Sequence, residues 1–251
     1  MAEKFTVPTE TIELPSQGKV YELTNPLASG TVEMKYMTAR EEDILTNVNL
    51  LKQGLAIEKV LRSLIKSPGR YEDLLLGDRN ALLIAARILA YGSQYSFKYY
   101  DSETETEETV TVDLQSLKNK EVDYSLFQNK NEFTFVLPFS KNTVTFKLLT
   151  IDDEKAMEAE AKGLKKANLT VGEITTRLKK QILSVNGSYD QKVVRDFVDN
   201  ALIAKDSNAL RNYIATLTPD IDLTVSFTLS ATGKEVVETL PLTAEFFFPG
   251  S

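Results

Sequence analysis

Residues 31–38 read TVEMKYMT and residues 143–150 read TVTFKLLT, and these two segments organise the whole chain. Threonine, valine, lysine and threonine recur at the same places in both, with apolar residues matched between them. In each segment apolar and polar residues alternate, which is typical of a β-strand with one buried face. Two such matched segments in one chain indicate an internal duplication.

The residues that follow both segments predict that each strand leads directly into a helix. Thr38 is followed at the third position by Glu41, and Thr150 is followed in the same way by Asp153. This is the spacing of a capping box, in which the hydroxyl and the acidic side chain each satisfy a backbone N–H at the start of a helix. Acidic residues there also suit the positive end of the helix dipole.

A second recurring motif supports the duplication. Residues 78–82 read DRNAL and residues 206–210 read DSNAL, and apolar residues at helical spacing follow in both copies. We interpret Asp78 and Asp206 as the N-caps of two equivalent helices. A hairpin pattern then ends each copy. A chance coincidence of capping motifs is the alternative, but it does not explain two different motifs that recur in the same order.

These patterns predict an α+β fold made of two homologous lobes from an internal duplication, each with antiparallel β-hairpins and a small helical bundle. The N-terminal lobe covers residues 1–113, a polar linker covers 114–131, and the C-terminal lobe covers 132–251. We expect residues 31–113 and 143–243 to superpose. The second copy is longer between its two motifs, so its helices must be longer too, and we expect two of them over residues 172–185 and 191–204.

The composition excludes several classes of function. The chain has 251 residues with neither cysteine nor histidine, which rules out disulfides, Cys and Ser–His nucleophiles, and nearly all zinc sites. Its net charge of −7 makes nucleic acid and anionic membrane poor partners. No signal peptide and no apolar run long enough to cross a membrane are visible, so we expect synthesis in the cytoplasm.

Two acidic groups are candidates for chemistry. Residues 101–108 read DSETETEE, which suits a divalent cation but lacks the turn glycine of a calcium loop, so a solvated hairpin tip is the alternative that we favour. Residues 152–160 hold a second acidic group, which is either a carboxylate pair for acid–base catalysis or ordinary charge at a helix start. We favour the latter, and we predict no catalytic residue, no metal site and no cofactor.

Two further features are candidates for partner binding. Lys165 and Lys179 belong to a basic side of the helices in the second copy, which either faces an acidic partner or is an ordinary solvated face. Phe246, Phe247 and Phe248 form the most aromatic segment of the chain, and we expect them to alternate between the two faces of a strand. That strand is either part of the core at a sheet edge or a hydrophobic docking tail.

Several segments resemble the baseplate hub assembly proteins of T4-like contractile-tailed phages. They are LPSQG at 14–18, YMTAREEDILTN at 36–47, DLLLGDRNAL at 73–82 and EFFFP at 245–249. As a set in this order they span nearly the whole chain. Many members of that family carry cysteine pairs in the two hairpins, and this chain has none, so the resemblance brings no metal site and no catalytic residue.

The resemblance implies a structural or assembly protein of the phage baseplate hub, which acts through contacts with other hub and tail proteins in the virion after synthesis in the host cytoplasm. The alternative is a transient assembly chaperone for hub or tape-measure proteins that is absent from the mature virion. A carboxylate or oxygen-metal enzyme is a third class, and it would need acids from both lobes in one cleft. The patterns leave homo-oligomerisation open.

Overall fold

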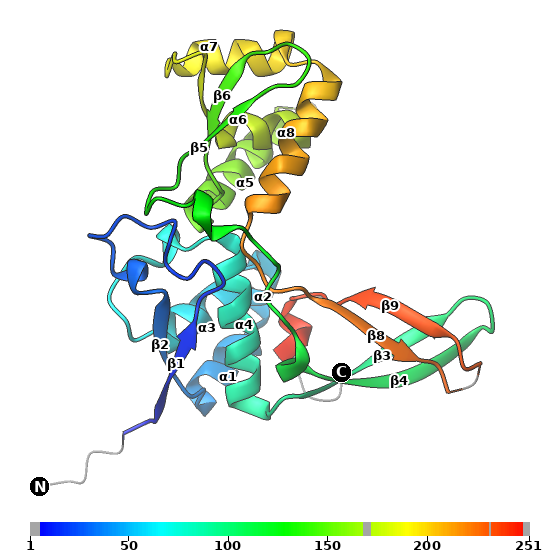
Figure 1. Cartoon of the computed structure of the whole chain (residues 1–251). Helices are drawn as coiled ribbons and strands as arrows, with labels where there is room; N and C mark the ends of the chain where they lie inside the picture. The colour runs from blue at the N-terminus through cyan, green and yellow to red at the C-terminus, as the bar shows by residue number, and fades with distance from the viewer. Residues whose placement is uncertain (1–5, 168–171, 231, 248–251) are drawn as a thin grey trace, which may run out of the picture.

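The computed structural model describes residues 6–167, 172–230 and 232–247 (Figure 1). Its first half contains β1 (Thr9–Glu13), β2 (Thr31–Lys35), α1 (Ala39–Leu45), α2 (Val48–Gln53), α3 (Ala56–Leu64), α4 (Leu76–Tyr91), β3 (Gln94–Asp101) and β4 (Thr106–Asp113). Its second half contains β5 (Phe133–Val136), β6 (Thr143–Phe146), α5 (Ile151–Lys166), α6 (Glu173–Gln181), β7 (Ile182–Val185), α7 (Gln191–Asp196), α8 (Ala204–Leu217), β8 (Thr224–Thr228) and β9 (Glu235–Thr239).

The molecule has three parts (Figure 1). A lower body holds β1, β2 and α1 to α4, and an upper body holds β5 to β7 and α5 to α8. The hairpins β3–β4 and β8–β9 lie side by side as an arm that projects from the lower body, and all the paired strands are antiparallel. The α+β prediction is therefore confirmed. No helix in the described part of the chain is long and apolar enough to span a membrane.

The predicted transition from strand to helix is confirmed in both halves. The backbone N–H of Thr38 donates to the Glu41 carboxylate at 3.0 Å, and that of Thr150 donates to Asp153 at 3.2 Å. The recurring lysine of each strand completes the motif, because Lys35 pairs with Glu41 at 2.8 Å and the equivalent lysine pairs with Asp153 at 2.7 Å. The repeated sequence thus encodes one local structure twice.

The aspartates of the DxNAL motif are not N-caps, so that prediction is wrong. α4 begins at Leu76 and α8 begins at Ala204, which puts each aspartate inside the first helical turn. Asp78 accepts the backbone N–H of Ser16 at 2.9 Å, and Asp206 accepts those of two adjacent residues, Phe139 and Ser140, both at 2.9 Å. Both aspartates are fully buried. They bind the loop that follows the first strand of their own half.

Two predicted helices in the second half also end differently. The helix expected over residues 172–185 stops at Gln181, and Ile182–Val185 form β7, which pairs with β6. This short apolar run is buried and its backbone extends the hairpin β5–β6 to three strands. The helix expected over residues 191–204 changes to a π-helical turn at Phe197–Ala201 before α8 begins. The first half has no strand equivalent to β7 among its described residues. At that position an isolated β-bridge joins Met34 of β2 to Ile65.

Candidate functional site

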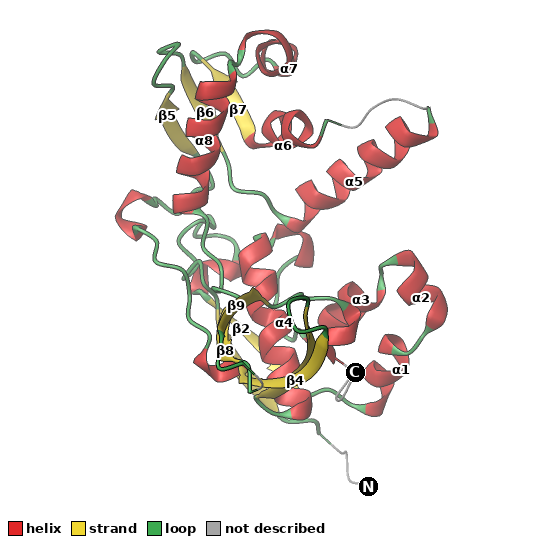
Figure 2. Cartoon of the chain, turned by 90° about the vertical axis from the view of Figure 1, so that its right-hand side faces the viewer, coloured by secondary structure: helices red, strands yellow, loops and turns green. Residues whose placement is uncertain are grey.

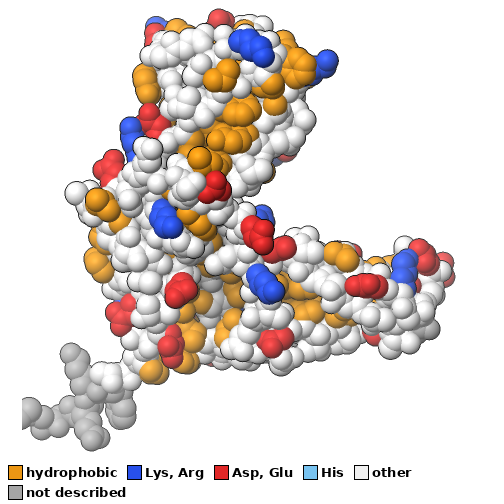
Figure 3. All heavy atoms as spheres, viewed as in Figure 1, with side chains coloured by type: hydrophobic (Ala, Val, Ile, Leu, Met, Phe, Trp, Pro, Cys, Tyr) orange, Lys and Arg blue, Asp and Glu red, His pale blue; other side chains and the backbone are white. Residues whose placement is uncertain are grey.

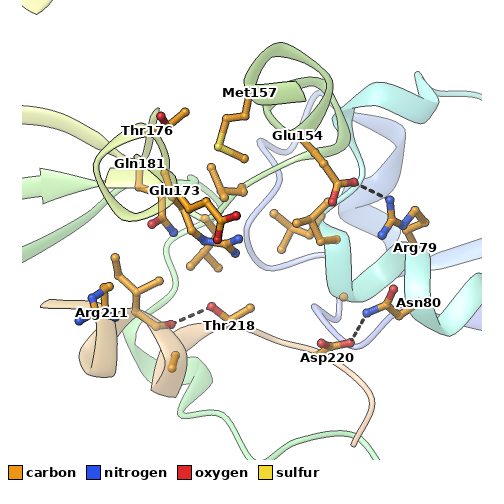
Figure 4. Close-up of a pocket in the computed structure, with 18 of the residues that line it drawn as sticks. Arg79, Asn80, Glu154, Met157, Glu173, Thr176, Gln181, Arg211, Thr218 and Asp220 are labelled. Atoms are coloured by element: carbon orange, nitrogen blue, oxygen red, sulfur yellow. Dashed lines mark hydrogen bonds and ion pairs between the residues drawn. The ribbon is translucent and has the colours of Figure 1, made fainter. Parts of the chain in front are cut away.

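An open cleft of about 1000 Å³ lies where the two bodies meet (Figure 4). Its walls come from the start of α4 and from α5, α6 and α8, which are far apart in the sequence. Figure 2 shows α5 running away from the body, so one wall of the cleft is a projecting helix. The cleft is thus a groove between helices, open to solvent.

Backbone contacts between the halves fix the base of this cleft. Leu75 forms a β-bridge with Thr150, and the N–H of Ile151 donates to the carbonyl of Leu74 at 3.0 Å. On the other side, the N–H of Lys120 donates to the carbonyl of Asp220 at 2.8 Å. Direct hydrogen bonds between main chains leave little freedom for the two walls to slide.

Gly77 makes the closest approach at the base. A Cβ atom built on Gly77 would lie 1.9 Å from the carbonyl oxygen of Pro219, where no side chain fits. Next to it, the Asn80 Nδ2 donates to the Asp220 carboxylate at 3.0 Å (Figure 4). The glycine of the sequence LLLGDRNAL therefore lets α4 pack directly on the segment after α8.

Apolar side chains form much of the cleft surface. Leu148 and Leu149 are buried beneath it, and Met157 of α5 points into it (Figure 4). Ile174 of α6 also lines the cleft and keeps 50% of its surface exposed, and Ala215 of α8 is exposed as well. An exposed apolar surface in a groove is typical of a site that another molecule covers.

Most charges in the cleft are paired within the chain. Arg79 Nη1 binds the Glu154 carboxylate at 2.6 Å, and Lys120 Nζ lies 3.6 Å from the Asp220 carboxylate. Glu158 pairs with a lysine one helical turn further along α5. The first two pairs each join two different walls of the cleft.

Two arginines in the cleft differ from this pattern. Arg177 of α6 and Arg211 of α8 are exposed, and neither forms an ion pair with any residue that the structure describes. The guanidinium of Arg211 makes one long hydrogen bond, of 3.5 Å, to the Asn208 side chain. The cleft thus presents two free cations beside an apolar surface.

The C-terminal aromatic segment is not a strand, so that prediction is wrong. Ala244–Phe247 form a 3-10 helical turn, in which Phe246 and Phe247 are each 1% exposed. The turn lets both rings enter the same core, where they meet edge to face, whereas a strand would separate them. Phe248 lies outside the described residues.

The surroundings of Phe246 belong to the first half of the chain. Its ring lies 4.9 Å from that of Tyr95, measured between centroids, and its carbonyl accepts a hydrogen bond from Arg87 Nε at 3.1 Å. Burial of this kind favours the interpretation of Phe246 and Phe247 as core residues. Their role in docking stays a prediction.

The two lysines singled out from the sequence lie on different helices and do not line the cleft. Lys165 is exposed near the end of α5, and Lys179 of α6 pairs with Asp199 at 2.6 Å. Arg177 lies two positions before Lys179 in the same basic helix, but no feature of the sequence indicates Arg211 as its companion. The glycine in LLLGDRNAL was the available signal for a close contact, and hence for the base of the cleft.

The acidic stretch at residues 101–108 lies at the tip of the arm. Asp101 accepts hydrogen bonds from the turn that follows it, and these lower the pKa of its carboxyl. Glu103 pairs with Lys234 of the neighbouring hairpin at 2.7 Å. Within the described ranges, no group of three or more acidic side chains is arranged to hold a metal ion. The acidic stretch is therefore a solvated tip of the hairpin β3–β4 that contacts the hairpin β8–β9.

Buried acids elsewhere have structural partners. Burial acts to raise the pKa of the Glu41 carboxyl, but the Lys35 ammonium and the hydroxyls around it outweigh this effect and lower the pKa to about 2. Burial raises the pKa of Asp78 and that of the Tyr21 hydroxyl, which donates to it. These groups lie inside the core, so their perturbed pKa values reflect packing and not an accessible reactive site.

One comparison with known proteins gives a match. A family model described as T4 bacteriophage base plate protein matches residues 7–248. Neither the curated proteins nor the solved structures contain a significant match to the chain.

Proposed function

Because this chain belongs to the T4 bacteriophage base plate protein family, we propose that it is a structural protein of the baseplate hub that acts through contacts with other tail proteins. The family match, over almost the entire chain, is the observation that carries the proposal. Membership in this family makes the chain a phage structural protein, with the virion tail as its place and tail proteins as its partners. The hub position and the mode of contact are the proposed parts.

The shape of the molecule supports a role in contacts. Figure 3 shows an angular outline in which the arm projects from the body. Several large apolar side chains outside the cleft are well exposed, among them Leu23 at 80% and Val237 at 63%. An extended outline and exposed apolar side chains suit a subunit that neighbours surround.

We also propose the internal duplication and the lobe boundaries at 1–113 and 132–251. Glu41 and Asp153 make equivalent contacts in the two halves, and so do Asp78 and Asp206. This equivalence supports the duplication. The two hairpins of the arm pack on each other, so the last part of the second lobe rests on the first. The lobes in this proposal are therefore evolutionary units that share one packed structure.

Quantitative mass spectrometry of purified virions and of isolated baseplates tests the hub proposal. A baseplate subunit should be present at a fixed ratio to other baseplate proteins in both preparations. A deletion phage should accumulate tail intermediates that the purified chain restores. If the chain occurs in assembly intermediates but not in virions, the transient chaperone is the correct function. If it occurs in neither, the structural role is wrong.

A further inference from the structure

Basic and acidic side chains are equal in number along the cleft, but two of the basic ones have no ion-pair partner among the described residues. They are Arg177 and Arg211, on a chain with a net charge of −7. Carboxylates are abundant on this chain, yet the described ones do not pair with these two arginines. An exposed arginine beside apolar surface is a common anchor of protein interfaces.

The other residues of the cleft narrow the class of occupant. Four acidic residues line the same walls: Glu154, Glu158, Glu173 and Asp220. A nucleic acid would bring its phosphates close to these carboxylates, which disfavours it. A polypeptide can instead place single carboxylates at the two arginines and keep apolar side chains elsewhere. The lining therefore fits a polypeptide with a few localised acids better than a nucleic acid.

The walls of the cleft also suit a helix. Met157, Ile174 and Ala215 come from three different helices, α5, α6 and α8, and offer separate apolar contacts around one groove. An amphipathic helix presents apolar side chains at positions i, i+3, i+4 and i+7, and binds by laying this face into such a groove. The fixed base at Gly77 and Pro219 means that the groove exists before binding, which lowers the entropic cost of association.

We propose that this cleft binds an amphipathic helical segment of another tail protein, with its apolar face on Met157, Ile174 and Ala215 and its carboxylates on Arg177 and Arg211. The inference rests on the proposed function, because it names the surface through which the chain contacts a partner. Glu173 lies in the same groove and repels a carboxylate that is misplaced toward the start of α6 (Figure 4). The arginines therefore set the register of the segment as well as its charge.

A binding assay with defined peptides tests the chemistry. The probe is a synthetic helical peptide of about 18 residues with leucines on one face and glutamates beside them, and the control peptide has lysines in place of the glutamates. We expect fluorescence anisotropy to show binding of the glutamate peptide alone. The variant with Arg177→Glu and Arg211→Glu should weaken this binding by about tenfold or more.

Matched variants separate this effect from general changes in charge or folding. Lys192→Glu changes an exposed lysine on α7, outside the cleft, and should leave the affinity within about twofold. Ile174→Asp should weaken binding through the apolar contact, and because Ile174 is half exposed the fold should tolerate it. Equal binding of both peptides, no binding of the glutamate peptide, or full affinity in the double arginine variant would each overturn the proposal.

Crosslinking in assembled baseplates tests the biological occupant. A photoreactive amino acid at position 174 should crosslink to one tail-protein segment that carries acids beside an apolar face, whereas one at position 192 should not. A crosslink to a second copy of this chain, or no crosslink, refutes the inference about the cleft. The proposed function still stands in that case if the chain is present at fixed stoichiometry, and fails only if the chain is absent from baseplates.

Discussion

Replacement of Phe246 by alanine distinguishes a core residue from a docking residue. The ring is 1% exposed and contacts Tyr95 and Phe247, so Phe246→Ala removes a fully buried aromatic side chain and leaves a cavity. Such truncations cost about 3–5 kcal/mol, and we expect about 3 because a short turn near the end of the described chain can relax into the space. At this chain length that loss lowers Tm by roughly 6–12 °C.

The assay is thermal and urea unfolding of the purified monomer, followed by both circular dichroism and tyrosine fluorescence. Tyr100→Ala is the matched control, because Tyr100 is 60% exposed on the same arm and its loss should cost less than about 0.5 kcal/mol. If Phe246→Ala lowered Tm by less than about 2 °C, the core assignment would be refuted. If that variant stayed folded and no longer entered baseplates, the docking interpretation would be correct.

Three further predictions concern other parts of the fold. Gly77→Ala should lower the free energy of unfolding by several kcal/mol, because its Cβ would meet the Pro219 carbonyl at 1.9 Å; urea unfolding at wild-type stability would contradict this. The Glu41 carboxyl has its pKa lowered from 4.5 to about 2 beside Lys35, so its stabilisation is complete above pH 4.5 and is lost as the pH falls toward 2. The stability advantage over Glu41→Gln, on the order of 1–2 kcal/mol at pH 7 after allowance for solvent screening, should therefore shrink in urea titrations at pH 3, and a constant difference would count against the ion pair. Asp206→Ala leaves two backbone N–H groups without their acceptor and should cost about 2–4 kcal/mol, whereas an unchanged denaturation midpoint would show that water replaces it.

The features that the sequence predicted well depend on neighbouring residues. A capping box joins residues three positions apart, so spacing alone predicts the pairs Thr38 with Glu41 and Thr150 with Asp153. The hairpins β3–β4 and β8–β9 were predictable for the same reason, because alternation and turn residues specify them locally.

The features that the sequence did not reveal depend on distant partners. Asp78 binds a backbone N–H 62 residues earlier in the chain, so its spacing within the DRNAL motif resembled a cap and concealed its true partner. Residues 182–185 became a strand because the exposed edge of β6 was available to pair with them. The cleft combines residues from 75 to 220, and only the packing of four helices brings Arg177 and Arg211 to one groove.

The arm has a consequence for the order in which the chain folds during synthesis. Its first hairpin carries Phe97 and Tyr99, and Phe227 of the second hairpin contacts both rings. Across the same arm, Glu108 and Ser230 are bonded although they are 122 residues apart, which a ribosome takes roughly 6–24 s to translate. During that interval the first hairpin has an uncovered aromatic face, which is covered only when the second hairpin has left the ribosome. A chain that lacks the second hairpin keeps this aromatic face exposed, and an exposed apolar patch of this kind favours aggregation.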